Sequence, residues 1–308
     1  MKIYQNTDNY NIRKPIVTVG TFDGLHLGHL KVIDSLKKIA DDNDGETVVF
    51  TFWPHPRLVI NNNNEKITLL NTLEEKIERF EKIGIEHLII HEFSKEFSLM
   101  NSFDFVKNIL VEKLNIHLLI VGYDHHFGNN REGGFDNLKQ YADKLNFEVK
   151  RIEALSHENI NISSTKIREA LYAGDIAIAE EFLGYSYMFS GKVVKGNELG
   201  NKIGFPTANI HIADKFKLIP NEGVYAVIIE FDKKQYKGML NIGFNPTVCN
   251  VRNKRIEVHI FDFNDNIYDK TIKIILKHKI RNEIKFDSIE QLKVQLNIDK
   301  KESLCLLK

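Results

Sequence analysis

Cysteine is nearly missing from this chain of 308 residues, which contains only Cys249 and Cys305. Two thiols exclude a disulfide framework and a four-thiolate metal site, and they are typical of a protein from a reducing compartment. No apolar run is long enough to span a bilayer, and the first residues, "MKIYQNTDNYNIRKP", lack the apolar core of a signal peptide. We therefore expect a cytoplasmic protein without a membrane partner.

Net charge is missing as well, because 42 Lys and Arg residues balance 42 Asp and Glu residues. Such a chain lacks the long-range field that concentrates a protein on nucleic acid, so we expect no nucleic-acid partner and local binding of any phosphate. Hydrophobic residues make up 43% of the chain, enough for a substantial core. The length favours two domains of moderate size, and we expect a monomer or a weak homo-oligomer.

The first 185 residues alternate short apolar segments with amphipathic ones. Segments such as "PIVTVG" (15–20) and "IHLLIVG" (116–122) are rich in Ile, Val and Leu, as strands buried on both faces are. Between such segments lie stretches with helical spacing, for example "GHLKVIDSLKKIADD" (28–42). This alternation predicts an α/β domain with a doubly wound parallel sheet, similar to a Rossmann fold, over residues 1–185.

The pattern changes near residue 187. Segments such as "GVYAVIIEF" (223–231) and "RIEVHIFDF" (255–263) are typical of strands, and Gly, Asn, Asp or Lys residues separate them. We predict a small antiparallel β-barrel over residues 186–308. The last segment, "SIEQLKVQLNIDKKESLCLL" (288–307), has helical spacing and is expected to pack across one opening of the barrel.

The motif "GTFDGLHLGH" (20–29) lies where the apolar segment 15–20 ends and a predicted helix begins. Gly24 and Gly28 allow a ligand to approach the backbone closely, and His26 and His29 are three residues apart, so their rings point toward the same volume. Imidazoles beside the N–H groups of a helix start can take up the charge of a triphosphate. The alternative is that both histidines only cap the helix.

A second motif, "NISSTKIREAL" (161–171), suggests the same chemistry. Ser163, Ser164 and Thr165 precede a predicted helix, and Arg168 is expected in its first turn. Hydroxyls, terminal N–H groups and a guanidinium then converge, which favours phosphate binding. A capping role alone would explain one hydroxyl.

Both motifs, together with "FTFWPHP" (50–56) and "VGYDHHFGNNREG" (121–133), stand in the order found in a known family. Over residues 15–185 the chain resembles the FMN adenylyltransferase module of prokaryotic bifunctional riboflavin kinase/FAD synthetases, in the nucleotidyltransferase superfamily. The resemblance implies that FMN attacks ATP to give FAD and pyrophosphate, with His29 and Arg168 as catalytic residues. It also implies that ATP is bound by Gly20, Phe22, Gly24, His26, Gly28, His29, Ser164, Thr165 and Arg168, and the flavin by Pro54, His55, Pro56, Asp124, Phe127 and Gly128. His125 departs from the family, in which a phenylalanine is usual.

The segment "GKVVKGNELGNKIGFPTANI" (191–210) is rich in glycine but lacks the spacing of a P-loop. Thr207 and Asn209 can offer two oxygens to a hard cation such as Mg²⁺, although an ordinary turn would also explain this stretch. In the strand expected at 255–263, alternation places Glu257 and His259 on one face.

Residues 187–308 resemble the riboflavin kinase module of the same family. The resemblance implies that Thr207 and Asn209 bind Mg²⁺ with ATP, that Glu257 is the catalytic base for the ribityl 5′-hydroxyl, and that Gly196, Gly200 and Lys202 also bind ATP. Asn201 departs from the family, which commonly has arginine there. A primary alcohol needs a base at neutral pH, whereas the phosphate of FMN does not.

The sequence therefore predicts an enzyme that converts riboflavin to FMN and FMN to FAD, with ATP as the second substrate and Mg²⁺ as cofactor. One alternative is a monofunctional FMN adenylyltransferase whose barrel binds flavin without kinase activity. A non-enzymatic protein that stores flavin or has a regulatory role is the other alternative.

Overall fold

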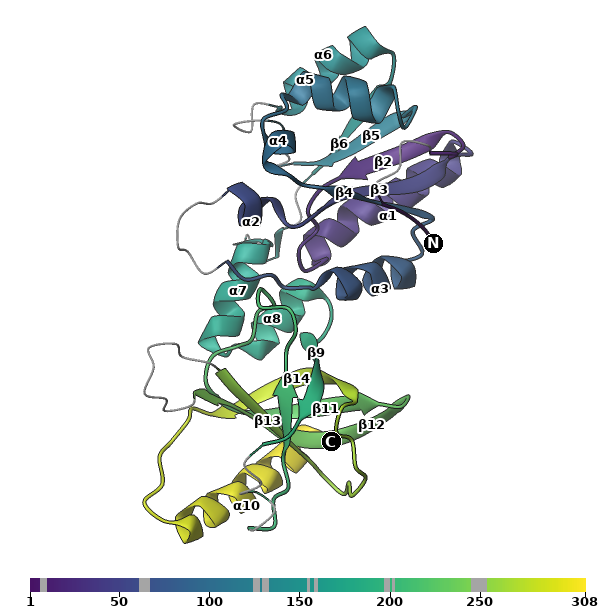
Figure 1. Cartoon of the computed structure of the whole chain (residues 1–308). Coiled ribbons are helices and arrows are strands. Elements are labelled where there is room, and N and C mark those ends of the chain that lie inside the picture. The colour runs from purple at the N-terminus through teal and green to yellow at the C-terminus, as the bar shows by residue number, and fades with distance from the viewer. Residues whose placement is uncertain are drawn as a thin grey trace. The chain divides into compact units, whose positions relative to one another are not determined.

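The structure is a computed structural model of the whole chain. It describes residues 1–5, 10–60, 67–123, 128, 133–153, 156–157, 160–196, 200, 203–244 and 254–308. The chain forms two compact units, Met1–Ser163 and Ser164–Lys308 (Figure 1). The functional division expected after residue 185 stays a prediction.

The first unit is built on a six-stranded sheet in which all neighbouring strands are parallel, which confirms the predicted α/β class. The strands lie in the order β1-β4-β3-β2-β5-β6. A short hairpin, β7 (Ser156–His157) with β8 (Ile160–Asn161), is separate from it. The sheet strands are β1 (Lys2–Gln5), β2 (Pro15–Val19), β3 (Glu46–Trp53), β4 (His87–Glu92), β5 (Leu118–Gly122) and β6 (Glu148–Ile152).

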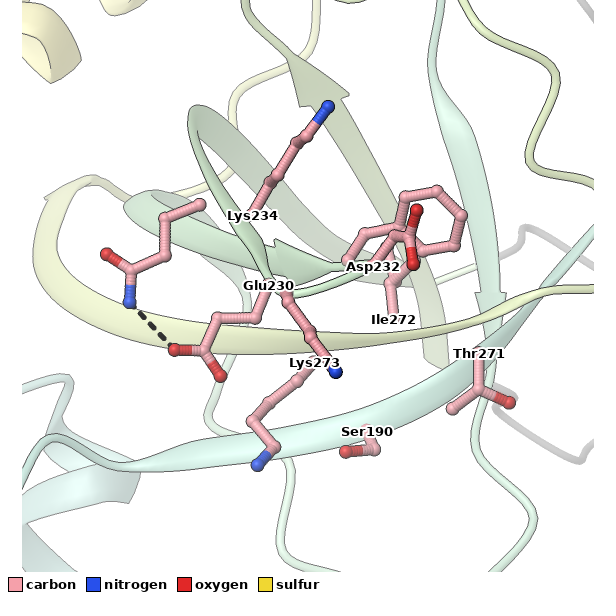
Figure 2. A pocket seen from close by; sticks show the side chains of 10 residues that line it. Ser190, Glu230, Asp232, Lys234, Thr271, Ile272 and Lys273 are labelled. Carbon is pink, nitrogen blue, oxygen red and sulfur yellow. Dashed lines mark hydrogen bonds between the residues drawn. The ribbon is translucent and has the colours of Figure 1, made fainter.

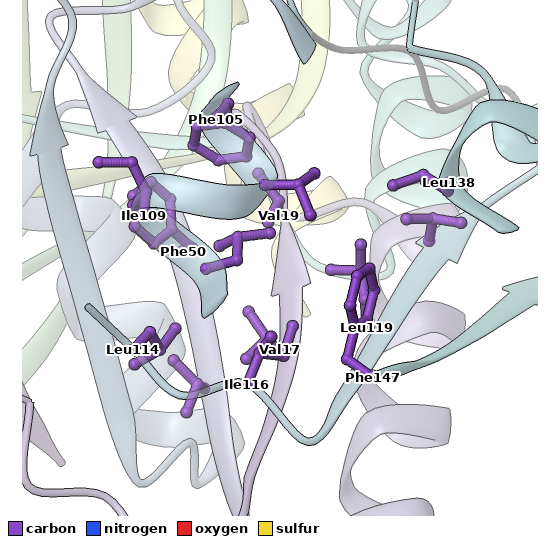
Figure 3. Packing of buried hydrophobic residues seen from close by; sticks show 14 of the residues in the cluster. Val17, Val19, Phe50, Phe105, Ile109, Leu114, Ile116, Leu119, Leu138 and Phe147 are labelled. Carbon is purple, nitrogen blue, oxygen red and sulfur yellow. The ribbon is translucent and has the colours of Figure 1, made fainter. Parts of the chain in front are cut away.

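Helices cover both faces of this sheet. Side chains of β2 alternate, so Val17 and Val19 pack with Phe105 in one cluster (Figure 3), while Ile16 packs with Ile33 in a second cluster. The first cluster joins η1 and α6, and the second joins α1 and α3. The helices of this unit are α1 (Leu27–Asp42), α2 (Pro56–Ile60), α3 (Leu73–Ile83), α4 (Lys95–Ser98), α5 (Ser102–Asp104), the π-helix η1 (Phe105–Val111) and α6 (Phe135–Leu145).

The strand order defines where this unit can bind a ligand. Strand β2 has β3 as its neighbour on one side and β5 as its neighbour on the other, so the order of the strands reverses direction at β2. Open α/β sheets bind ligands at such a switch point, beyond the carboxyl ends of the strands. The segments that follow β2, β3 and β5 therefore share one edge of the sheet, and each contains a predicted site motif.

The second unit is a closed antiparallel barrel with the order β10-β13-β12-β11-β14-β9, as predicted. The "PTANI" segment contributes strand β10, which the sequence pattern did not identify. The strands are β9 (Met188–Val194), β10 (Ala208–His211), β11 (Gly223–Phe231), β12 (Lys234–Phe244), β13 (Lys254–Ile260) and β14 (Thr271–Arg281).

Helices α7 (Ser164–Ala173) and α8 (Ile176–Leu183) pack onto the barrel. The Asn221 side-chain amide donates to the Tyr172 carbonyl at 2.5 Å, and the Lys277 ammonium lies 3.7 Å from the Glu180 carboxylate. These contacts explain why the compact unit begins at Ser164.

Helix α10 (Ile289–Leu306) confirms the predicted terminal helix. Its leucines Leu292, Leu296 and Leu304 pack against a buried cluster that contains Phe205 and Met239. Within the described ranges, no helix is both long enough and apolar enough to cross a membrane.

Candidate active sites

The turn between β2 and α1 carries the first predicted site. Gly24, Phe22 and Leu25 have φ angles of 87°, 47° and 40°, all in the left-handed region that glycine tolerates and other residues avoid. The Gly20 amide donates to the Phe50 carbonyl on β3 at 3.0 Å, which fixes the start of the turn. A tight, left-handed turn therefore presents the start of α1 at the switch point.

The two histidines of this turn have different surroundings. His26 is the N-cap of α1, and its Nδ1 accepts a hydrogen bond from the His29 amide at 3.4 Å. The two rings stack with centroids 3.7 Å apart, and the Phe22 ring packs edge-on against His29 with a centroid distance of 5.3 Å. The Nδ1 atom of His29 is buried and has no hydrogen-bond partner among the described residues. The capping interpretation thus fits His26 but gives His29 no role.

Electrostatics favour the neutral form of His29. Burial lowers the pKa of the His29 imidazole well below its ordinary value, and positive charge on His26 and Lys76 lowers it further. At neutral pH the ring is a hydrogen-bond donor and acceptor rather than a cation. It can donate to a phosphate oxygen without carrying a full charge of its own.

The predicted flavin-binding residues follow β3 and β5. Pro54 and His55 connect β3 to α2, which begins at Pro56, and His55 is buried with its Nδ1 accepting from the Arg57 amide at 3.2 Å. Gly128, with φ 78°, follows β5 and packs so closely on Ser102 that a Cβ atom would lie 2.7 Å from it. Asp124, His125 and Phe127 lie outside the described residues.

Ser164, Thr165 and Arg168 lie on α7, in the second unit. Because α7 begins at Ser164, Arg168 is one full turn into the helix. Since the helix starts at Ser164 rather than after Thr165, Arg168 is its fifth residue, two residues later than expected and just beyond the first turn. The ATP-binding roles of these three residues stay predictions.

The barrel brings together most residues of the second predicted site. Asn209 on β10 pairs with Glu257 on β13, and Glu257 pairs on its other side with Asn241 on β12. Paired residues of neighbouring antiparallel strands point to the same face, so the Glu257 carboxylate stands in a row between two amides. Asn209, Glu257 and Asn241 therefore form a polar row across three strands of the barrel.

Two glycines are close to this row. A Cβ atom on Gly196 would overlap the Asn209 amide, so only glycine permits this packing. A Cβ on Gly200 would lie 3.3 Å from the Thr207 hydroxyl oxygen. The described part of the Gly-rich segment thus packs on the residues predicted to bind Mg²⁺ and ATP, while Asn201 and Lys202 lie outside the described residues.

A cavity of about 350 Å³ adjoins Thr207. Its walls include Pro206, Val258 and Tyr268, so it combines apolar surface with the Thr207 hydroxyl. Such a pocket suits a flat, partly apolar ring with a polar tail.

Sequence reasoning placed His259 on the face of Glu257 but gave it no role, and it did not name Arg255. Arg255 donates to the Glu257 carboxylate at 2.5 Å. The buried His259 ring places Nδ1 2.7 Å from the Pro206 carbonyl, directly before Thr207. Residues 255, 257 and 259 alternate onto one face of β13, so the same period that located His259 was a signal that could have found Arg255.

A second cavity of about 490 Å³ lies at the β11–β12 turn (Figure 2). Charged side chains such as Glu230, Asp232 and Lys273 surround it, and the Gln235 amide donates to Glu230 at 2.8 Å. None of the predicted site residues lines this cavity.

Metal binding rests on Thr207 and Asn209. In the described parts of the chain, no group of three or more His, Cys, Asp or Glu side chains is placed to hold a metal ion. A hydroxyl and an amide oxygen do fit Mg²⁺, which takes few protein ligands and completes its shell with water and nucleotide oxygens.

Comparison with known protein families agrees with this geometry. A family model for FAD synthetase matches residues 8–166, and one for riboflavin kinase matches residues 183–307. The parallel sheet and the barrel together therefore define a flavin nucleotide transferase with two modules.

The chain belongs to the bifunctional riboflavin kinase/FMN adenylyltransferase family. The relative from Buchnera aphidicola of Schizaphis graminum is 41% identical, with coverage of 92% of this chain and 91% of the relative. The relative from Listeria monocytogenes is 37% identical, with coverage of 96% and 94%. This chain is accordingly a transferase with both activities, and the monofunctional and storage alternatives are not supported.

A crystal structure from Streptococcus pneumoniae, of a protein named a macrolide-efflux protein, has a TM-score of 0.89 and 31% identity to this chain. The match covers 98% of this chain and 98% of the other, so the two proteins share their fold over almost their whole length. The efflux name describes that protein alone.

Proposed function

We propose that the barrel transfers the γ-phosphate of ATP to riboflavin and that the first unit transfers AMP from ATP to the FMN so formed. The observation that carries the kinase assignment is the row of Asn209, Glu257 and Asn241 beside Thr207. The stacked pair of His26 and His29 at the switch point supports the adenylyltransferase assignment.

In the barrel, Glu257 accepts the proton of the ribityl 5′-hydroxyl, and the oxygen attacks the γ-phosphorus while ADP leaves. Arg255 binds Oε1 of this carboxylate and orients it, so Oε2 can face the alcohol. Thr207 and Asn209 would hold Mg²⁺. When bound, the ion neutralises charge on the nucleotide phosphates.

In the first unit, an oxygen of the FMN phosphate attacks the α-phosphorus of ATP, and the bond to pyrophosphate breaks. The nucleophile is already an anion, so the unit needs no general base. The neutral His29 ring and the N–H groups at the start of α1 donate hydrogen bonds to the phosphates as charge shifts onto pyrophosphate. The contributions of Ser164, Thr165 and Arg168 rest on their positions in the family motif.

The proposal is tested with the full chain, riboflavin and Mg-ATP, followed by chromatography of the flavins. We expect FMN and FAD, and FMN without FAD would contradict the assignment. Glu257→Gln should abolish FMN formation while FAD formation from added FMN persists. His29→Ala should give the reverse pattern, with FAD synthesis reduced roughly 100-fold, the cost of one charge-stabilising donor.

Three further expectations accompany the function. Chelation of Mg²⁺ should stop both reactions, and restoring the ion should recover them. We also expect a cytoplasmic protein that is a monomer or a weak homo-oligomer, which analytical ultracentrifugation of the purified chain would measure.

A further inference from the structure

Lys76 is a buried cation to which the mechanism above gives no role. It lies on α3, and its side chain is only 1% exposed. By contrast, Lys82 on the same helix is exposed and pairs with Glu78, as surface lysines do. Lysine is rarely this buried, because removing its charge from water is costly.

The contacts of Lys76 connect two segments of the first site. Its ammonium donates a hydrogen bond of 2.7 Å to the Thr21 carbonyl, inside the turn between β2 and α1. The same group lies 5.6 Å from the ring centroid of Trp53, which ends β3. Lys76 therefore bridges the turn that presents the histidines and the strand that leads to Pro54.

The turn needs such support, since Phe22 and Leu25 have left-handed backbones that cost energy in non-glycine residues. Asp23 Oδ1 accepts from the amides of Leu70 and Asn71, at 2.9 and 3.3 Å, and so ties the turn to the chain just before α3. Lys76 supplies a second tie from α3 itself.

A chain of ring contacts continues from α3 to His29. Phe80 lies one turn beyond Lys76 on the same face of α3. Its ring packs edge-on against Phe22 with a centroid distance of 5.7 Å, and Phe22 in turn packs against His29 with a centroid distance of 5.3 Å. A shift of the Thr21 carbonyl would move the adjoining Phe22 and, with it, the support of the His29 ring.

We propose that Lys76 is a positioning residue for adenylyl transfer: it holds the Thr21 carbonyl and thereby fixes Phe22 and His29 at the ATP site. This inference rests on the proposed role of His29. The cation is retained at a place where a methionine would be buried at less cost, which indicates a functional reason.

The charge states support the proposal. Burial lowers the pKa of Lys76 to about 8, and the nearby Asp23 carboxylate opposes this shift, so the side chain is still mostly charged at neutral pH. The titratable groups that act on His29 are His26, from the turn before α1, and Lys76, from α3, and both lower its pKa. Lys76 therefore also favours the neutral imidazole that donates to phosphate.

The test compares Lys76→Met with Lys82→Met, a matched loss of a lysine from the exposed face of the same helix. With FMN and Mg-ATP, we expect kcat of Lys76→Met to fall about 10-fold or more, with KM values nearly unchanged. Riboflavin kinase activity of the same chain and both activities of Lys82→Met should be unaffected. The emission of Trp53, which is the single tryptophan, reports whether the first unit is folded.

A second readout separates positioning from a merely structural role. The His29 ring signal, assigned in NMR spectra by its loss in His29→Ala, should titrate at a higher pH in Lys76→Met than in the unmodified chain. A folded Lys76→Met with normal kcat, or with an unchanged imidazole pKa, would overturn the inference. Should Lys76→Met not fold, Lys76→Gln removes the charge but retains an N–H donor. We then expect kcat to fall less than about 10-fold while the His29 ring still titrates at a higher pH, and an unchanged imidazole pKa would overturn the inference.

The outcomes also distinguish this inference from the proposed function. If His29→Ala slows FAD synthesis and Lys76→Met does not, only the role of Lys76 is wrong. If neither variant slows FAD synthesis, the phosphate role of His29 is wrong as well.

Discussion

The buried charge of Lys76 predicts a pH dependence of stability that can be measured directly. Burial lowers the pKa of Lys76 from 10.5 to about 8. Since one pKa unit corresponds to about 1.4 kcal/mol, the ammonium reduces the free energy of unfolding of the first unit by about 3 kcal/mol at neutral pH. The side chain is 1% exposed, so solvent does not screen this effect.

The direction follows from which state binds the proton more tightly. Below about pH 8 both the folded and the unfolded chain carry the charge, and the cost of burial is complete. As the pH rises from about 8 to about 10.5, the folded chain loses the proton first, so its stability increases. Above about pH 10.5 neither state is charged and the cost is gone.

Lys76→Met removes this titration. Relative to the variant, the unmodified chain should gain about 3 kcal/mol in free energy of unfolding between about pH 7.5 and about pH 10.5. Urea unfolding followed by Trp53 emission measures the first unit at each pH, and Lys82→Met serves as the control that keeps the gain. Equal pH slopes for Lys76→Met and the unmodified chain would refute the claim that a charged lysine is buried here.

Two further predictions concern the barrel. His259→Leu should raise the KM for ATP in the kinase reaction about 10-fold, because the Pro206 carbonyl loses its donor. His259→Asn, whose amide nitrogen lies near the position of Nδ1, should restore most of the affinity, and equal KM values for both variants would contradict the hydrogen bond. Arg281→Met should lower the free energy of unfolding of the second unit by about 3–5 kcal/mol, measured by circular dichroism, because it strands the fully buried Asp299 carboxylate. The double variant with Asp299→Leu should recover much of this loss, and a single variant as stable as the unmodified chain would show that the ion pair contributes little.

Hydrophobic periodicity was enough to predict both architectures. The central strands of the sheet are apolar on both faces because helices cover both. In the barrel, β13 alternates at its start, whereas β11 is buried at its first five residues, so its Val, Ile and Tyr content and the flanking turn residues indicated a strand. Strand β10 escaped this reasoning because Pro206 and Thr207 precede only four strand residues, and its partner on β13 is remote, since Asn209 pairs with Glu257. Register between remote strands is set by tertiary packing, which a local pattern does not contain.

For the two candidate sites, the sequence provides the motifs but not the residues that support them from other elements. His26, His29, Thr207 and Glu257 stand in local patterns whose chemistry can be read directly from the sequence. Lys76 looks like one more lysine of an amphipathic helix, and its partner at Thr21 is 55 residues away. Its burial depends on where α3 packs, so only the folded chain shows it.

The charged side chains of the two candidate sites differ in a way that matches the nucleophile of each reaction. Riboflavin brings an alcohol, so the barrel needs a base, and Arg255 holds the proposed base, Glu257, by an ion pair. FMN brings a phosphate that is already an anion, so the first unit needs donors that tolerate negative charge and no base. There the Lys76 ammonium lies on the Thr21 carbonyl behind the turn, and His29, the ring that we propose to face the phosphates, is neutral. Neutralising Glu257 should therefore affect one activity and neutralising Lys76 the other, because each charge serves the nucleophile of its own unit.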